Sequence, residues 1–412
     1  MTAEIITIGD ELLIGQIVNT NAAWMSRELN LIDVPVRFVS VVGDNAEDIR
    51  RSLDLALSRT EVVLLSGGLG PTHDDITKKV VAEYFDSADM VLDEKVLTHV
   101  KALLQRRNIR VKPANEAQAL VPKKATVLWN DYGTAPGLLF QRNGRYCIVM
   151  PGVPAEMQHI MRERVLPFLK TRIHNAAVRH RTIRTFGVPE SALFEKLSPV
   201  ADLEQFGRVA FLPRFSGVDV RISVHASSAA EAEERIGAAE AIVISRAGEH
   251  VYGFDEDVME AVIGRLLMEK NATLAVAESC TGGLLAHRFT NIPGSSQYFD
   301  RGIVAYSNSA KMQLLGVSEE ILHQHGAVSE QCAIALAAGV RRLSGTTYGL
   351  ATTGIAGPTG GSEEKPVGLV WVGVATPSLA FAQKAVFTGD RQANKERFSQ
   401  LALNLLYQEL RK

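Results

Sequence analysis

The segment AESCTGG, residues 277–283, places a carboxylate, two hydroxyls, a thiol and two glycines within seven positions. A strand-like stretch, ATLAVA, precedes it, and Gly282 and Gly283 open a helix-like stretch. A hydroxyl on such a turn lies near unpaired N–H groups, which can stabilise the oxyanion formed when that hydroxyl attacks a carbonyl. Ser279 is therefore a candidate nucleophile, and its alternative role is an N-cap, a common use of serine. Cys280 is expected to point elsewhere, as a small buried hydrophobe.

A serine nucleophile needs a base to remove its proton. His287 lies about two turns beyond Ser279 and would project along the helix, while the spacing in HQH (residues 323–325) suits no single helical face. Lys311 is the better candidate, because burial or neighbouring cations can keep a lysine neutral. Tyr306, at the end of the preceding strand, can relay or donate a proton. The alternative is structural: Tyr306 would belong to the core and Lys311 to a helix surface.

A second candidate site is the loop SGGLGPTHDDIT, residues 66–77, between a strand and a helix. Glycines let backbone N–H groups approach a ligand, and a helix N-terminus favours an anion. The paired carboxylates of Asp74 and Asp75 are able to hold a hard cation or a sugar hydroxyl. Alternatively, the glycines only shape a turn and Asp75 caps the helix. The loop matches neither G-x-G-x-x-G nor a Walker loop, so those templates do not apply.

The elements that would position these residues fall into three segments. Residues 1–172 alternate strand and helix patterns, which predicts a parallel sheet with helices on both faces. Residues 173–253 follow a β-α-β-β-α-β order without a catalytic cluster or an RNA-clamping G-x-x-G loop, so a spacer or interface role is expected. Residues 254–412 alternate again. The predicted fold class is α/β: two α/β sandwich domains joined by a small α+β module.

The composition argues against several classes of protein. A net charge of −2, spread evenly, does not suggest a nucleic-acid binder, so no direct nucleic-acid binding is expected. No apolar run reaches membrane-spanning length, and the first residues lack a signal-peptide pattern. The cysteines Cys147, Cys280 and Cys332 are odd in number and far apart, which indicates neither a disulfide framework nor a C-x-x-C metal site. We therefore expect a cytoplasmic protein without membrane association.

Five motifs of the third segment occur together: AESCTGG, GIVAYSNSAK, GAVSE, TGIAGPTGGSEEKPVG and FTGDR. Their order and separations resemble those of the C-terminal domain of the CinA family, which deamidates nicotinamide mononucleotide. The resemblance implies that Ser279, Tyr306 and Lys311 form the catalytic group. Lys311 would take the Ser279 proton directly or through Tyr306, nicotinic acid mononucleotide and ammonia would be the products, and no cofactor would be required.

The same resemblance implies where the nucleotide binds. The loop TTGIAGPTGG, residues 352–361, would form a wall of the pocket, with glycine backbone approaching the ribose phosphate. The expected substrate-binding residues are Gly282, Gly283, Thr353, Gly354, Gly357 and Arg391. Arg391 could pair with the phosphate, or it could be a surface residue of the last helix.

The first glycine loop resembles the phosphate-and-pterin loop of the MogA/MoaB molybdopterin-binding fold. TIGDELLIGQIVNTN, VVGD and MPGVPAEM are similar to the version of this domain in the CinA family, which is linked to metal-dependent hydrolysis of ADP-ribose. The resemblance implies nucleotide binding at Gly67, Gly68, Gly70, Thr72, Asp75, Thr77, Pro151 and Gly152. It also implies a divalent metal, for which Glu11, Asp44, Asp75 and Glu156 are the candidate ligands. Each carboxylate taken alone could instead be a cap or a surface charge.

Two other functions stay open. The N-terminal domain could be a sensing module that holds a nucleotide or a pterin without turning it over. The chain could also be a competence-associated partner protein in DNA uptake or damage responses, although its neutral charge gives direct DNA binding no support. A homodimer is expected, since two-fold dimers are the commonest assembly.

Overall fold

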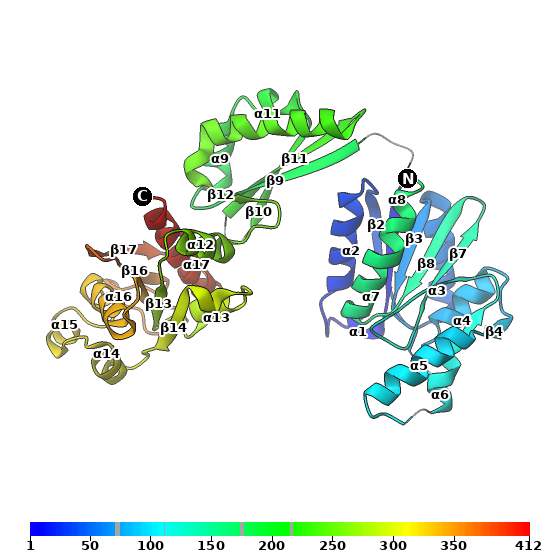
Figure 1. The fold of residues 1–412 in the computed structure, drawn as a ribbon, viewed down its shortest axis with the longest axis horizontal. Helices are drawn as coiled ribbons and strands as arrows, with labels where there is room; N and C mark the ends of the chain where they lie inside the picture. The colour runs from blue at the N-terminus through cyan, green and yellow to red at the C-terminus, as the bar shows by residue number, and fades with distance from the viewer. Residues whose placement is uncertain (71–74, 111, 174–176, 215–216) are drawn as a thin grey trace. The chain divides into compact units, whose positions relative to one another are not determined.

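The computed structural model describes residues 1–70, 75–110, 112–173, 177–214 and 217–412. Thr72 and Asp74 of the first glycine loop therefore lie outside the described residues. The chain divides into two compact units, Met1–Val178 with Ala226–Ala229, and Arg179–His225 with Ala230–Lys412 (Figure 1). Among the described residues, no helix has the length and apolar character needed to cross a bilayer.

The first unit is built on a six-stranded sheet in the order β2-β1-β3-β8-β7-β6. Its strands are β1 (Ala3–Ile8), β2 (Val36–Val42), β3 (Val62–Ser66), β6 (Thr126–Leu128), β7 (Gly137–Arg142) and β8 (Arg145–Met150). The first four strands in the sheet order are parallel, and β7 and β6 are antiparallel additions. Ile5 and Ile6 are both fully buried but belong to different apolar clusters, so the sheet has a core on each face.

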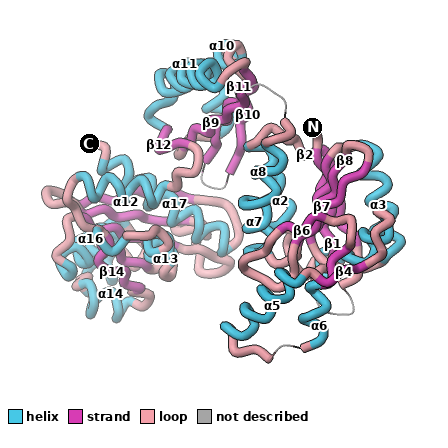
Figure 2. The backbone as a smooth tube through the Cα atoms, turned by 45° about the vertical axis from the view of Figure 1, so that its right-hand side comes forward, coloured by secondary structure: helices cyan, strands magenta, loops and turns pink. Residues whose placement is uncertain are grey.

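Helices cover both of these faces (Figures 1 and 2). The helices α2 (Thr20–Leu31) and α7 (Pro154–Ile160) supply Met25, Leu29 and Met157 to one core. The helices α3 (Ala46–Arg59) and α4 (Thr77–Tyr84) supply Ile49, Leu53 and Val81 to the other. The unit also contains α5 (Glu94–Arg106), α8 (Leu166–Lys170) and a short β4–β5 ribbon (Met90–Leu92, Leu120–Pro122).

The second unit begins with a small module around a four-stranded sheet, ordered β10-β11-β9-β12. Its elements are β9 (Ala177–Thr185), α9 (Glu190–Leu197), α10 (Ala201–Glu204), β10 (Arg208–Arg214), β11 (Gly217–Ala226), α11 (Ala229–Ala247) and β12 (Val251–Phe254). Apart from the one-turn α10, this is the predicted β-α-β-β-α-β order.

The remainder of the second unit, here called the C-terminal domain, has a five-stranded sheet ordered β14-β13-β15-β16-β17. Its strands are β13 (Leu274–Glu278), β14 (Phe299–Val304), β15 (Tyr348–Gly354), β16 (Leu369–Ala375) and β17 (Ala380–Val386). Its helices include α12 (Met259–Glu269), α13 (Leu284–Thr290), α14 (Asn308–Leu315), α15 (Glu319–Gln324), α16 (Glu330–Ser344) and α17 (Arg391–Leu410). The fold-class prediction of two α/β sandwiches and a small α+β module is confirmed.

The strand directions bring the predicted catalytic residues to one edge of this sheet. β13 is parallel to both β14 and β15, so their carboxyl ends lie together. Ser279 follows β13, Tyr306 follows β14, and Thr352 and Thr353 lie just before Gly354, the last residue of β15. Ligands of open α/β sheets bind outside the carboxyl ends of the strands, which makes this edge the natural place for a site.

Candidate active sites

Glu278, and not Ser279, caps the helix that follows AESCTGG. The Glu278 carboxylate accepts hydrogen bonds from the N–H groups of Gly283, Leu285 and Ala286 at 2.9, 3.1 and 2.8 Å, and the residue is only 1% exposed. Helix α13 begins at Leu284, five positions after Ser279. The N-cap alternative for Ser279 is therefore wrong, and so is the expectation that the helix-start N–H groups face the Ser279 hydroxyl, because Glu278 already occupies them.

Ser279 is instead in contact with Lys311. The Lys311 Nζ lies 3.1 Å from Ser279 Oγ and donates to the main-chain carbonyls of Ala305 and Tyr306, both at 2.9 Å. Lys311 is 1% exposed, although it comes from the first turn of α14. The alternative of a surface lysine is thus wrong.

The surroundings of Lys311 favour its neutral form. Burial lowers the pKa of the Lys311 ammonium, an effect that the nearby Cys332 and Cys280 thiols oppose. The three acceptors around Nζ are a hydroxyl and two carbonyls, none of which carries a charge. A neutral amine has two N–H groups and one lone pair. When the two carbonyls accept the N–H groups, the lone pair faces Ser279 Oγ, which is the geometry of a general base.

Tyr306 takes part through its main chain, and its side chain lies elsewhere. The Tyr306 carbonyl accepts from Lys311, whereas its hydroxyl accepts from Arg391 Nη2 at 3.1 Å and the residue is 60% exposed. A proton relay from Ser279 through Tyr306 to Lys311 therefore does not fit, since Lys311 touches Ser279 directly. The alternative of a core tyrosine does not fit either.

The predicted substrate-binding residues separate into those at the rim of the site and those buried in the fold. Arg391 bonds the Gly357 carbonyl at 2.7 Å as well as Tyr306, so these three residues form one rim. Thr353 is 1% exposed and donates its hydroxyl to the Ala327 carbonyl at 2.6 Å, which leaves it no proton for a substrate. Gly354 is a packing position, because a Cβ there would lie 2.5 Å from the Leu369 carbonyl oxygen.

Lys395 was missed in the sequence. It lies one turn after Arg391 in α17, and a Cβ built on Gly282 would be 3.6 Å from its Nζ. Gly282 and Gly283 have φ values of 62° and 99°, so both use the left-handed region that glycine favours. Arg391 and Lys395 have the i, i+4 spacing that puts two side chains on one helix face, and this spacing was the available signal.

Cys280 can be set aside as a nucleophile. Its thiol lies in the apolar core of the C-terminal domain, and burial raises its pKa to about 12. The thiolate is the reactive form of cysteine, so this side chain is inert near neutral pH.

In the first unit, the four predicted carboxylates line a single pocket of about 420 Å³. The lining includes Glu11, Asp44, Asp75 and Glu156 together with Gly67, Gly68, Gly70, Pro151 and Gly152. Thr77 is fully buried behind the loop, and its hydroxyl has no partner within the described residues. Each glycine of the loop is tightly enclosed: a Cβ on Gly67, Gly68 or Gly70 would lie 2.1, 2.0 or 2.5 Å from another atom.

The electrostatics of this pocket favour a cation. Burial raises the pKa of the Asp44 carboxyl, the carboxylates of Asp10, Glu11 and Asp75 raise it further, and the Asp10 N–H opposes them. Asp10 was not predicted, although it is adjacent to Glu11 in the sequence. Within the described residues, no three His, Cys, Asp or Glu side chains stand close enough to one point to hold a metal ion. The pocket thus has the charge for a cation but not a ready-made ligand set.

Comparisons with known proteins agree with this architecture. The probable molybdopterin binding domain matches residues 4–171, the damage-inducible protein CinA KH domain matches residues 180–253, and the CinA C-terminal domain matches residues 256–410. A CinA-like protein of Salinibacter ruber is 45% identical, and one of Chloroherpeton thalassium is 44% identical, each over 98% of both chains. The chain belongs to the CinA family. A solved CinA superfamily protein of Klebsiella pneumoniae is 33% identical over 37% of this chain and 96% of that chain, with a TM-score of 0.36.

The glycine loop of this CinA-family chain gives a first prediction. Gly68→Ala is expected to destabilise the first unit by about 2 kcal/mol more than Gly144→Ala, because overpacking adds to the backbone strain. Both glycines have left-handed φ, 65° and 76°, but only a Cβ at Gly68 meets an atom, Thr77 Oγ1 at 2.0 Å. Thermal unfolding of the two variants measures the difference. Equal losses of stability would mean that the loop has room for a side chain.

Proposed function

We propose that the C-terminal domain hydrolyses the carboxamide of nicotinamide mononucleotide to nicotinic acid mononucleotide and ammonia. The observation that carries the proposal is the distance of 3.1 Å between Ser279 Oγ and Nζ of Lys311, which is buried and has no charged hydrogen-bond partner among the described residues. A hydroxyl next to a lysine whose burial favours the neutral form suits acyl transfer, since the neutral amine can take the proton as the oxygen attacks.

In the first half of the reaction, Lys311 accepts the Ser279 proton while Ser279 Oγ attacks the amide carbon. The main-chain N–H groups of Cys280 and Thr281, the two residues after Ser279, have no acceptor within the described part of the chain, which makes them the candidate donors to the oxyanion. Lys311 then returns the proton to the leaving nitrogen, the C–N bond breaks, and ammonia departs. An ester on Ser279 remains.

In the second half, water replaces ammonia. Lys311 accepts a proton from the water as it attacks the ester carbon, and then gives the proton back to Ser279 Oγ as the acid leaves. Each side chain ends in its starting state, so the chain's own residues account for every proton.

The rim of the site suits a nucleotide monophosphate. Arg391 and Lys395 bring two cationic side chains to the loops of Ser279 and Gly357, and a guanidinium pairs well with phosphate oxygens. The ring of Tyr306 is 60% exposed and its hydroxyl accepts from Arg391, so it offers a flat surface for a heteroaromatic ring beside that cation.

The test is ammonia release from nicotinamide mononucleotide by the intact chain, with a chelator present throughout. Turnover is expected for the intact chain and for Cys280→Ala, and none for Ser279→Ala. The neighbouring cysteine is the matched control because it lies on the same loop and is inert. Equal activity of a folded Ser279→Ala variant would refute the serine mechanism, and an inactive intact chain would refute the proposed reaction.

A second function is proposed for the N-terminal unit, metal-dependent hydrolysis of ADP-ribose. It is supported by the carboxylate-lined pocket around Asp44, where burial, and after it the carboxylates of Asp10, Glu11 and Asp75, raise the pKa of the Asp44 carboxyl. Glu11, Asp44, Asp75 and Glu156 are the residues that would hold a divalent ion. Their side chains would have to move to do so, because no three of them converge on one point within the described residues. The ion, when bound, would polarise a phosphate oxygen and acidify water. Release of AMP by the intact chain, lost in Asp44→Asn but not in Ser279→Ala, separates this function from the first and from a purely sensing domain.

A further inference from the structure

The small module and the C-terminal domain meet along helix α17, and this line of contact is here called the seam. Tyr407 of α17 donates its hydroxyl to the Val251 carbonyl at 3.1 Å, and its ring meets that of Phe186 edge-on, with centroids 5.3 Å apart. Two cavities, of about 330 and 480 Å³, lie in the seam and share Arg214 and Gln400 as lining residues. Both are of the size of small-molecule sites, which favour domain interfaces.

The larger cavity has apolar walls contributed by both partners. The module provides Val188, Pro189, Pro213 and Val218, and the C-terminal domain provides Phe387 and Leu401. Charged and amide groups are fewer and comprise Glu190, Arg214, Arg397, Gln400 and Asn404. An apolar chamber with few polar groups suits a flat organic body that is oriented by one end.

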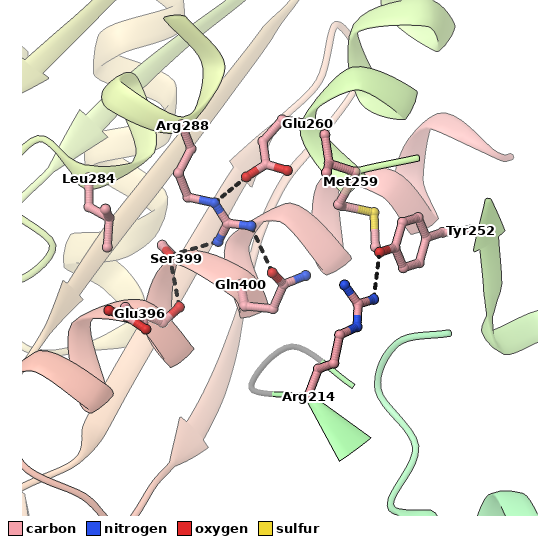
Figure 3. Close-up of a pocket in the computed structure, with 10 residues that line it drawn as sticks. Arg214, Tyr252, Met259, Glu260, Leu284, Arg288, Glu396, Ser399 and Gln400 are labelled. Atoms are coloured by element: carbon pink, nitrogen blue, oxygen red, sulfur yellow. Dashed lines mark hydrogen bonds and ion pairs between the residues drawn. The ribbon is translucent and has the colours of Figure 1, made fainter. Parts of the chain in front are cut away.

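The smaller cavity is polar. Of its four charged residues, Glu260 and Arg288 pair with each other, and the other two are Arg214 and Glu396. Figure 3 shows the Arg288 guanidinium bonded to Glu260, Ser399 and Gln400, which come from α12 and α17. Glu260 and Arg288 form an ion pair, so this cluster attracts neither sign of charge strongly. Arg288 therefore joins α13 to α12 and α17, and it is not available to bind a ligand.

Arg214 differs because it shares its counter-ion. Arg214 and Arg184 both contact the single carboxylate of Asp219, each with a nitrogen 2.6 Å from Oδ2. Asp219 is only 1% exposed, so one buried negative charge faces two guanidinium groups. The three side chains together carry one excess positive charge. Arg214 is the better paired of the two arginines, because its Nη2 also donates to Asp219 Oδ1 and to the Tyr252 hydroxyl. Its Nη1 has no partner within the described residues and is left to bind an anion where the two cavities meet.

We propose that the seam is a binding site for a small organic anion with a flat, apolar body. Its carboxylate, sulfonate or phosphate would pair with Arg214, and its body would lie between Phe387, Leu401 and the module's prolines. This site is separate from the Ser279 and Asp44 sites, so it stands whether or not either proposed reaction occurs.

The test is a fluorescence titration of the full chain with 8-anilino-1-naphthalenesulfonate, an aromatic sulfonate. One saturable site is expected. The affinity for the dye should fall about tenfold or more in Leu401→Glu, which puts a negative charge on the apolar wall, and in Arg214→Gln, which removes the cationic partner of the sulfonate. Leu379→Glu and Arg301→Gln make the same chemical changes at exposed positions of the C-terminal domain outside both cavities, and they are expected to bind normally. Benzoate should displace the dye and the neutral benzamide should not.

Two outcomes would overturn the proposal. One is the absence of saturable binding to the intact chain. The other is equal binding by the seam variants and their matched controls, which would place the dye elsewhere. Circular dichroism of each variant confirms that a loss of binding does not come from unfolding.

Discussion

Lys311→Met is expected to lower kcat/KM for ammonia release by about 10²- to 10⁴-fold, the usual contribution of a general base. Methionine fills a similar volume without a basic nitrogen, so Ser279 keeps its place but loses the acceptor for its proton. Lys311→Arg is the matched control, because it keeps a long cationic side chain that does not deprotonate in proteins. The two variants should be similarly inactive. Recovery of activity in Lys311→Arg would show that positive charge, and not proton transfer, is what the site needs.

The same lysine predicts two pH dependences of known sign. Activity requires the neutral amine, so the rate should rise with pH through the folded-state pKa of Lys311, which burial holds below 10.5. Stability follows the same direction: between the folded and unfolded pKa values the unfolded chain binds more protons, and the intact chain gains stability as pH rises. Below the folded-state pKa, the full cost of burying the charged ammonium lowers the stability. Lys311→Met has no such group, so the difference between the pH profiles of its free energy of unfolding and that of the intact chain isolates the contribution of Lys311.

Glu278→Ala is expected to destabilise the C-terminal domain by about 3 kcal/mol or more, because three main-chain N–H groups at the start of α13 lose a charged acceptor at once. Within the described residues, the N–H groups of Gly283, Leu285 and Ala286 have no acceptor other than the Glu278 carboxylate. Hydrogen exchange at these amides is the measurement, since it reports on the helix start itself rather than on unfolding of the whole chain.

Glu278→Gln provides the comparison, because it keeps one acceptor oxygen and the same shape. A smaller loss of protection is expected, together with partial activity, since Ser279 is the next residue on the same turn. If Glu278→Ala left the exchange rates of all three amides unchanged, the carboxylate would not be the cap.

Much of this arrangement could be predicted from the sequence. Alternating strand and helix patterns gave the order of the layers, and the resemblance to the CinA family predicted that Ser279, Tyr306 and Lys311 would lie together. The direct contact could not be predicted, because it depends on how α14 is turned relative to β14, and a one-residue rotation would place Tyr306 differently. Strand endings do not fix such rotations.

The errors have a common physical cause. Sequence spacing shows which side chains are near one another but not which hydrogen-bond partner each finally takes. Thr353 was expected to bind substrate, yet the Ala327 carbonyl takes its hydroxyl. Ser279 was the cap that the sequence suggested in AESCTGG, but Glu278 takes this role, because a carboxylate can accept several N–H groups together.

Helix α17 has a thermodynamic consequence. Its first turn carries Arg391 and Lys395 at the Ser279 site, and its middle carries Gln400 and Leu401 at the seam. If a ligand at one site moves α17 and so changes the affinity of the other site by some factor, the ligand at that other site must change the affinity of the first by the same factor. A molecule in the seam that tightens nucleotide binding would itself be held more tightly when nucleotide is present, and the size of that factor would measure how stiffly the helix joins the two sites.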